Sequence, residues 1–161
     1  MLNRDRWILL GATGLGVGYS PAAPGTFGSL VGLGLAWGIS GWPQALAGGV
    51  AVAVCGLAVW LSHEAEGILG AKDPGLIVID EIAGMLVACW GLTLSVPAAI
   101  ALFALFRLFD ITKPFPVGWL DRHLTGGLGI VADDVAAGIL ANLVYRLGSW
   151  IAGISGIAGT S

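Results

Sequence analysis

The sequence predicts an all-α protein: a compact helical bundle that is integral to a membrane through about five apolar helices, with a polar site at one face. The 161 residues are 57% hydrophobic and 11% charged, roughly half the charge of a typical soluble domain. Turns rich in glycine and proline separate the apolar runs. Acidic residues gather at the ends of those runs, where charge is costly and indicates function. A tightly oligomeric soluble protein is the alternative for this composition, because a soluble monomer would expose large apolar patches.

The chain is predicted to begin with a short helix or interfacial segment over residues 7–19. Two arginines before an apolar run resemble a signal peptide, but glycines weaken this helix and no polar domain follows, so we predict no cleavage. Turn-forming residues predict a loop over 20–29. The next apolar segment, 30–40, is short for a bilayer span, which needs about 20 residues.

Two prolines mark the starts of later helices. Pro43 and Pro97 each suit the first position of a helix, where a missing N–H costs little. They predict apolar helices over 43–62 and 97–110. Between these, segment 76–93 is apolar except for an acidic pair that lies several residues inside it.

The last part of the chain is predicted to hold one more helix. Two prolines directly after the 97–110 segment cannot continue a helix interior. Residues 117–132 are predicted to form a polar, glycine-rich connection, and an apolar helix over 134–152 is predicted to begin at an acidic pair. No internal repeat or linker interrupts the chain, so we predict a single domain over residues 1–161.

An up-and-down path through these segments brings the charged loops to one face. The turns over 40–43 and 93–97 fall on the opposite face and carry no charge. The charged face contains most of the basic residues, namely Arg4, Arg6, Lys72, Lys113 and Arg122. Basic loops face the cytoplasm, so this face is predicted to be cytoplasmic. Arg146 lies within the last apolar segment and must pair or extend toward the interface.

Five carboxylates lie at or inside the ends of apolar segments. We predict that they come together as catalytic residues and as ligands of a magnesium ion: Asp80, Glu81, Asp110, Asp133 and Asp134. Clustered carboxylates with few histidines suit a hard cation such as Mg²⁺, which can neutralise phosphate oxygens and activate water. The alternative is helix capping by Asp133 or Asp134, which explains the Asp80–Glu81 pair poorly.

The substrate of such a site is predicted to be a phosphate ester. Arg107 and Lys113 share a helix face with Asp110 and could hold a phosphate, although an internal ladder of salt bridges is the alternative. The 20–29 loop leads into a helix N-terminus, where free N–H groups favour anions, so Thr26 and Ser29 are predicted to bind substrate.

Several other classes of function are disfavoured. The net charge is -3 and there is no basic run, so nucleic acid is not expected as a partner. Cys55 and Cys89 lie inside apolar segments and lack metal-binding spacing, so we expect buried thiols and no zinc site. No nucleophilic triad is evident in the sequence.

Four motifs together resemble the phosphatidylglycerophosphatase A family. They are PAAPGTFGSL at 21–30, DPGLIVIDEIAGM at 73–85, FRLFDITKPFP at 106–116 and GGLGIVADDVAAG at 126–138. Each motif alone has low specificity, but all four occur in the same order as in the family and span most of residues 14–145. No acidic position departs from the family pattern.

The resemblance implies a magnesium-dependent phosphatase of the bacterial inner membrane, with its active site facing the cytoplasm. Such an enzyme removes the terminal phosphate of phosphatidylglycerophosphate, giving phosphatidylglycerol and phosphate. The resemblance also implies an all-helical fold. Because the family includes members without clear spans, a peripheral arrangement stays open; oligomeric state is not predicted.

Two functions from other classes remain as alternatives. An ion-coupled membrane transporter would use Asp80, Glu81 and Asp110 as its ion site. Transporters usually place that site near the midplane between repeated halves, whereas here the charges gather at one face and no repeat is visible. A structural membrane subunit with buried ion pairs is the second alternative. Phosphate release from a lipid phosphomonoester would separate the enzyme from both.

Overall fold

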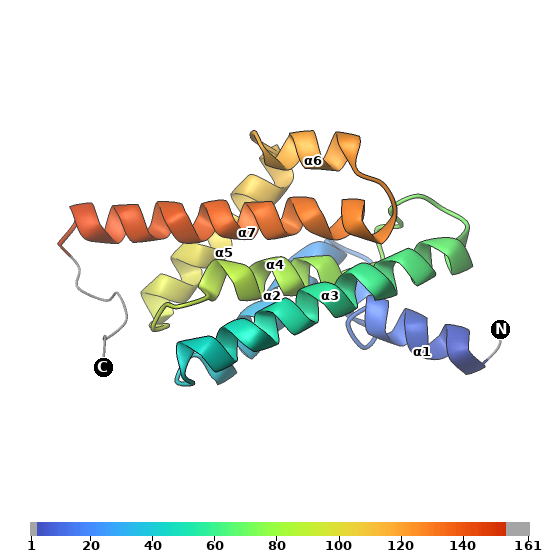
Figure 1. The fold of residues 1–161 in the computed structure, drawn as a ribbon, viewed down its shortest axis with the longest axis horizontal. Coiled ribbons are helices and arrows are strands. Elements are labelled where there is room, and N and C mark those ends of the chain that lie inside the picture. The colour runs from blue at the N-terminus through green and yellow to red at the C-terminus, as the bar shows by residue number, and fades with distance from the viewer. Residues whose placement is uncertain (1–2, 154–161) are drawn as a thin grey trace.

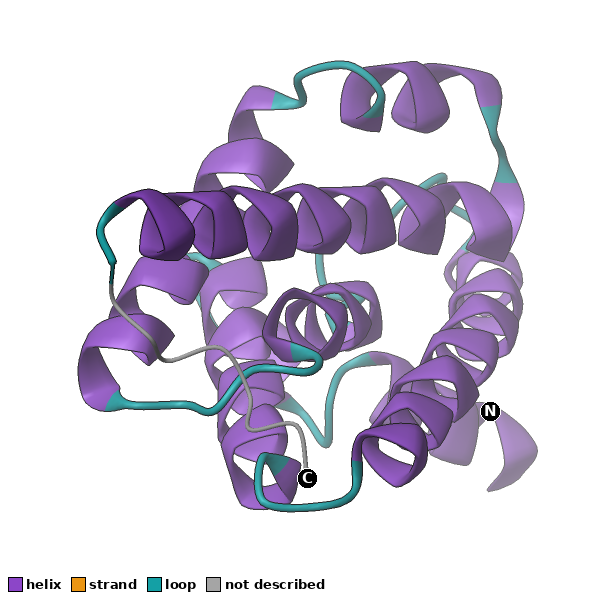
Figure 2. Cartoon of the chain, turned by 60° about the vertical axis from the view of Figure 1, so that its left-hand side comes forward, coloured by secondary structure: helices purple, strands orange, loops and turns teal. Residues whose placement is uncertain are grey.

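The computed structural model describes residues 3–153, and within them the chain forms helices joined by loops, without a strand (Figures 1 and 2). The elements are α1 (Asn3–Ala12), the 3-10 helix η1 (Val17–Tyr19), α2 (Pro24–Ile39), α3 (Gln44–Leu69), α4 (Ile79–Cys89), α5 (Val96–Thr112), α6 (Val117–His123) and α7 (Gly126–Ile151). The all-α prediction is therefore confirmed for this part of the chain.

Two helices in the described part are long and apolar enough to cross a membrane by length and composition: α3 and α7. This is fewer than the roughly five apolar spans expected from the sequence. The difference is clearest at α4, which has 11 residues, whereas a full span needs about 20. Helix α4 is instead an interior helix of the bundle.

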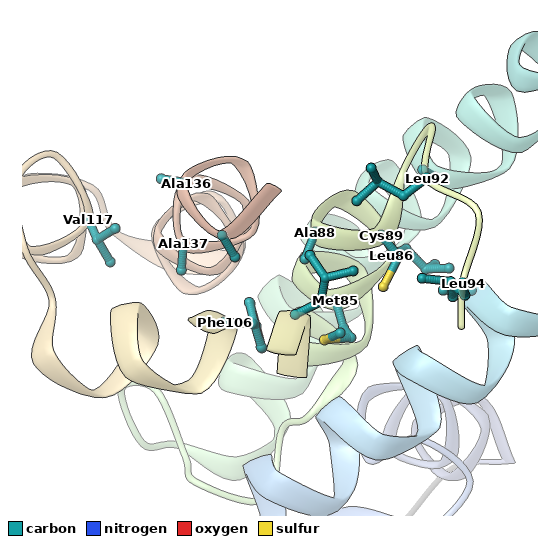
Figure 3. Close-up of a cluster of buried hydrophobic side chains, with 14 residues drawn as sticks. Met85, Leu86, Ala88, Cys89, Leu92, Leu94, Phe106, Val117, Ala136 and Ala137 are labelled. Atoms are coloured by element: carbon teal, nitrogen blue, oxygen red, sulfur yellow. The ribbon is translucent and has the colours of Figure 1, made fainter. Parts of the chain in front are cut away.

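Helix α4 packs against α2, α3, α5 and α7, and most of its residues are buried. Its apolar side chains form one core with side chains of α5, α6 and α7 (Figure 3). Met85, Leu102, Phe106 and Val117 have the largest fully buried side chains of that core. Because α4 is enclosed, Asp80 at its N-terminus is buried.

A pair of glycines allows α4 and α7 to approach so closely that their backbones are in contact. A Cβ atom on Gly138 would lie 2.3 Å from the carbonyl oxygen of Gly84, and one on Gly84 would lie 2.6 Å from the carbonyl oxygen of Asp134. Both distances are far below van der Waals contact, so neither position has room for a side chain. Gly84 therefore admits the backbone of α7 close to the acidic residues.

The far end of α4 is capped by polar side chains of α7. Asn142 donates hydrogen bonds to the carbonyl oxygens of Ala88 and Trp90, and Arg146 donates to those of Trp90 and Gly91. The last carbonyl groups of a helix lack intrahelical partners, and buried ones are costly to leave unpaired. The expectation that Arg146 must pair is confirmed, and its partners are backbone oxygens.

Two predictions for the last third of the chain are wrong. Residues 117–123 and 126–132 are helical, as α6 and the start of α7, and only 124–125 form a connection. Glycine usually disfavours helix, but a Cβ on Gly127 would lie 1.9 Å from the carbonyl oxygen of Val59, so tertiary packing requires glycine here. Helix α7 therefore begins at Gly126, and neither Asp133 nor Asp134 caps it.

Other helix boundaries also differ from the prediction. The predicted 20–29 loop is wrong from Pro24 onward, because α2 starts there with proline in its first turn. Helix α3 continues to Leu69 rather than stopping near residue 62. Helix α4 starts at Ile79, so the acidic pair lies in its first turn and not several residues inside.

Candidate active site

Three carboxylates from α4 and α7 converge on one point. Asp80, Glu81 and Asp134 each offer an oxygen, and these oxygens lie within 4.8 Å of one another. Asp80 and Glu81 are in the first turn of α4, where the helix dipole favours negative charge. The glycine contact between α4 and α7 brings Asp134 to them. Three of the five carboxylates that were predicted to come together thus lie close to one another.

Some of the buried oxygens of this cluster lack a hydrogen-bond partner. Asp80 and Asp134 are 7% and 4% exposed, and Oδ1 of Asp80 and Oε2 of Glu81 have no hydrogen-bond partner among the described residues. Burial, followed by the charges of Glu81 and Asp134, raises the pKa of Asp80 well above its usual range. Burial likewise raises the pKa of Glu81.

These oxygens fit a bound cation. Buried carboxylates that lack partners are costly unless paired or coordinated to a metal. An all-oxygen donor set suits hard divalent ions such as Mg²⁺. The orphaned oxygens, their close spacing and the donor type are therefore all compatible with a metal ion at this cluster.

Arg107 and Asp110, from the last turns of α5, lie beside the cluster. Nη1 of Arg107 is 2.6 Å from Oδ2 of Asp110 and donates a 3.3 Å hydrogen bond to Oγ of Ser29. Oγ of Ser29 in turn donates to the carbonyl oxygen of Gly25, at 2.7 Å. Nε of Arg107 is buried and has no partner among the described residues, so this guanidinium keeps an unused donor.

Lys113 bridges two other carboxylates instead of joining the Arg107–Asp110 pair. It ends α5 in the left-handed region, with φ of 45°. Its Nζ donates to Oδ1 of Asp121 and, at 2.9 Å, to Oδ2 of Asp133. Burial alone would lower the pKa of Lys113, but these hydrogen bonds outweigh it and raise the pKa above its usual value. Lys113 is therefore a permanent cation beside Asp133.

The structure thus divides the predicted site residues into groups. Three carboxylates form the cluster, Asp110 is paired with Arg107, and Asp133 is paired with Lys113. Thr26 lies in the first turn of α2, not in a loop, and Ser29 is fully buried, with its hydroxyl donating within the protein.

Sequence reasoning missed two residues of this region. Gly25 lies against Glu81 and Arg107, and Asp121 binds Lys113. The Pro-Gly pair at the start of α2 was a signal for Gly25, since a helix N-terminus that approaches a ligand needs a small residue. Asp121 was not predicted to lie near the site, because the residues of α6 were expected to form a connection rather than a helix.

A cavity of ≈ 450 Å³ lies next to Asp133, between the α3–α4 loop, α6 and the start of α7. Its lining includes Lys72, Asp73, Arg122 and Thr125. Charged side chains of both signs line it, so it is a polar cavity and differs from the apolar surfaces along α3 and α7.

Fold and site together define an all-helical, strongly apolar protein with a cluster of carboxylates that could hold a metal ion. Residues 10–149 match the family model described as phosphatidylglycerophosphatase A. The chain is 37% identical over 155 residues to phosphatidylglycerophosphatase A of Escherichia coli (strain K12), covering 92% of this chain and 87% of that protein. It is 39% identical over 147 residues to the Haemophilus influenzae protein of the same name, covering 89% and 90%.

The chain therefore belongs to the phosphatidylglycerophosphatase A family and is a phosphatase of lipid metabolism. A third relative, from Bacteroides thetaiotaomicron, is 34% identical over 162 residues, covering 91% of this chain and 95% of that protein. Its provisional name is phosphatidylinositol-3-phosphatase. No solved structure matches this chain.

Proposed function

We propose that this protein hydrolyses phosphatidylglycerophosphate to phosphatidylglycerol and phosphate, with Mg²⁺ as cofactor, at the cytoplasmic face of the bacterial inner membrane. The observation that supports this most is the cluster of Asp80, Glu81 and Asp134, which is largely enclosed and has oxygens without hydrogen-bond partners, in a chain of this family. A transporter would need an ion path between repeated halves, and no internal repeat is visible in this sequence.

The three clustered carboxylates are proposed to hold the metal, with Asp110 and Asp133 as further ligands or supports beside them. When bound, Mg²⁺ supplies charge neutralisation at phosphate oxygens and activation of water. Arg107 is held by Asp110 and Ser29 and would offer its unused Nε donor to the phosphate. The N-terminus of α2, including Thr26, adds backbone dipoles that favour the same anion.

The test is phosphate release by purified protein from phosphatidylglycerophosphate in mixed micelles, with and without Mg²⁺. Release that depends on Mg²⁺ is expected, and chelation should abolish it. Phosphatidylinositol 3-phosphate is the informative second substrate, because one relative is named for it. Faster turnover of the inositol lipid would replace the proposed substrate, and no release from either lipid would reject the proposal.

Lys113 is proposed to contact the substrate phosphate as well. Its ammonium has three donors, and Asp121 and Asp133 use two of them, which leaves one for a phosphate oxygen. Lys113→Met should lower kcat/KM by about tenfold or more beyond any loss of folded protein, because a charge-assisted bond contributes about 1.5–3 kcal/mol.

The matched control for Lys113 is Asp121→Asn, which removes one ion pair but keeps the lysine. Its kcat/KM should change little, because Asp121 is partly exposed and such pairs contribute about 0–1 kcal/mol. If turnover of Lys113→Met only follows its folded fraction, measured by circular dichroism, the lysine is structural and does not contact phosphate.

The proposed orientation is tested by thiol labelling from outside intact cells, in a background in which Cys55 and Cys89 are replaced by alanine. A cysteine at Gly41, which is exposed and in open space, should be modified. A cysteine at Gly75, equally open and on the charged side, should be spared until the membrane is permeabilised. Gly118 is unsuitable for this purpose, because a Cβ there would lie 2.5 Å from the carbonyl oxygen of Lys113. The reverse labelling pattern would overturn the orientation.

A further inference from the structure

The start of α2 meets the acidic cluster at a glycine. Gly25 is buried in the first turn of α2. A Cβ atom built on it would lie 2.1 Å from Oε1 of Glu81 and 3.2 Å from Nη1 of Arg107. The space that any side chain would fill is therefore already taken by the Glu81 carboxylate.

We infer that Gly25 is a positioning residue of the site: its missing side chain is what allows Glu81 to reach Asp80 and Asp134. The inference rests on the proposed cation-binding role of Glu81. It adds α2 to the elements that shape the cluster, which otherwise consists of α4 and α7.

A second observation ties the same position to Arg107. The carbonyl oxygen of Gly25 accepts from Ser29, and Ser29 accepts from Nη1 of Arg107. The backbone of Gly25 is thus fixed against the guanidinium while its Cα faces the carboxylate. This arrangement places the metal-binding carboxylate and the proposed phosphate-binding arginine on either side of one residue without a side chain.

The contact predicts a specific consequence for Gly25→Ala. The atom in conflict is the end of a flexible side chain and not backbone, so the fold can relax by moving the Glu81 carboxylate. Helix α2 should keep its stability, since alanine suits a helix better than glycine. Metal affinity should fall by about 10–100-fold, the range seen when a group that orients a ligand is lost.

The matched control is Gly34→Ala. Gly34 lies in the same helix, and a Cβ there meets no atom within 4 Å. Binding of Mn²⁺, followed by electron paramagnetic resonance as a probe of the Mg²⁺ site, should be unchanged in this variant. Melting temperatures of the two alanine variants should be similar, which separates positioning from a loss of fold.

A double-mutant cycle gives the decisive result. Glu81→Asp shortens the carboxylate by one methylene and should weaken Mn²⁺ binding alone, because the oxygen no longer reaches its place. In Gly25→Ala/Glu81→Asp the shorter side chain leaves room for the new methyl group. If the two substitutions acted independently, their fold-losses in Mn²⁺ affinity would multiply in the double variant. We expect the double variant to bind Mn²⁺ at least about tenfold more tightly than that product predicts.

The inference would be overturned if the losses of Mn²⁺ affinity in the two single variants simply multiplied in the double variant. It would also be overturned if Gly25→Ala bound Mn²⁺ as tightly as the wild-type protein does. A large drop in melting temperature for Gly25→Ala that Glu81→Asp does not relieve would show a purely structural glycine, and would overturn it as well. Mn²⁺ binding is read without any substrate. A failure of phosphatidylglycerophosphate hydrolysis would therefore reject the proposed function while leaving the Gly25 cycle interpretable.

Discussion

Glu81→Gln and Asp134→Asn should each abolish Mg²⁺-dependent turnover while leaving the protein folded. Each variant removes one charge from a buried cluster whose oxygens lie within 4.8 Å of one another. We expect turnover to fall by at least about 100-fold, beyond the effect of losing only a supporting group. Phosphate release and Mn²⁺ binding, measured on the same preparations, should be lost together.

The stability of these variants should change in the opposite direction. Like charges that are buried without a counter-ion destabilise the fold, and removing one relieves that cost. In the presence of a chelator, the melting temperature of Asp134→Asn should therefore equal or exceed that of the wild-type protein. Added Mg²⁺ should raise the melting temperature of the wild-type protein but not of the variant, because only the former binds the ion.

A surface carboxylate provides the control for this prediction. Glu64 pairs with Arg4 at 2.6 Å on the outside of α3, away from the cluster. Glu64→Gln should keep turnover, Mn²⁺ binding and the Mg²⁺-dependent rise in melting temperature. Full activity of Glu81→Gln with bound Mn²⁺ would show that the cluster is not the metal site.

Gly138→Ala should strongly destabilise the contact between α7 and α4. The new methyl group would lie 2.3 Å from the carbonyl oxygen of Gly84 and 3.2 Å from the backbone nitrogen of Ala88. Both contacts are backbone atoms of the enclosed helix α4, so the two helices must separate. Overpacking of this kind costs about 1–3 kcal/mol, occasionally more, against a gain of at most about 1 kcal/mol in helix propensity.

The same displacement should weaken the site. Asp134 lies one turn before Gly138 on α7, and it reaches Asp80 and Glu81 only because α7 lies against α4. Thermal unfolding in detergent and Mn²⁺ binding should therefore both show losses for Gly138→Ala. Gly148→Ala, in the same helix but with open space around the new methyl group, should lose neither. Equal stability of the two variants would show that the helices do not need this contact.

Local signals in the sequence were sufficient for much of the fold. Apolar runs between turn residues gave helices, and the prolines at 114 and 116 placed the end of α5 close to Thr112. The same signals failed for residues 126–132, where three glycines and a polar flank argued for a loop. The low helix propensity of glycine contributes little free energy in such a segment, and the close packing of Gly127 against α3 outweighs it.

For the site, the sequence by itself determined the chemistry: carboxylates at the ends of apolar segments, with an arginine and a lysine nearby and no rival metal ligands. Only the tertiary structure decided which carboxylates meet. Asp80 and Asp134 are 54 positions apart in the chain. Lys113 was predicted to share a helix face with Asp110, but in the structure it pairs with Asp121 and Asp133. The physical reason is that side-chain periodicity reports the face of one helix, whereas convergence depends on how closely helices approach. Here that approach is set by glycines at 25, 84 and 138, whose effect appears only when a second backbone or side chain occupies the space they leave.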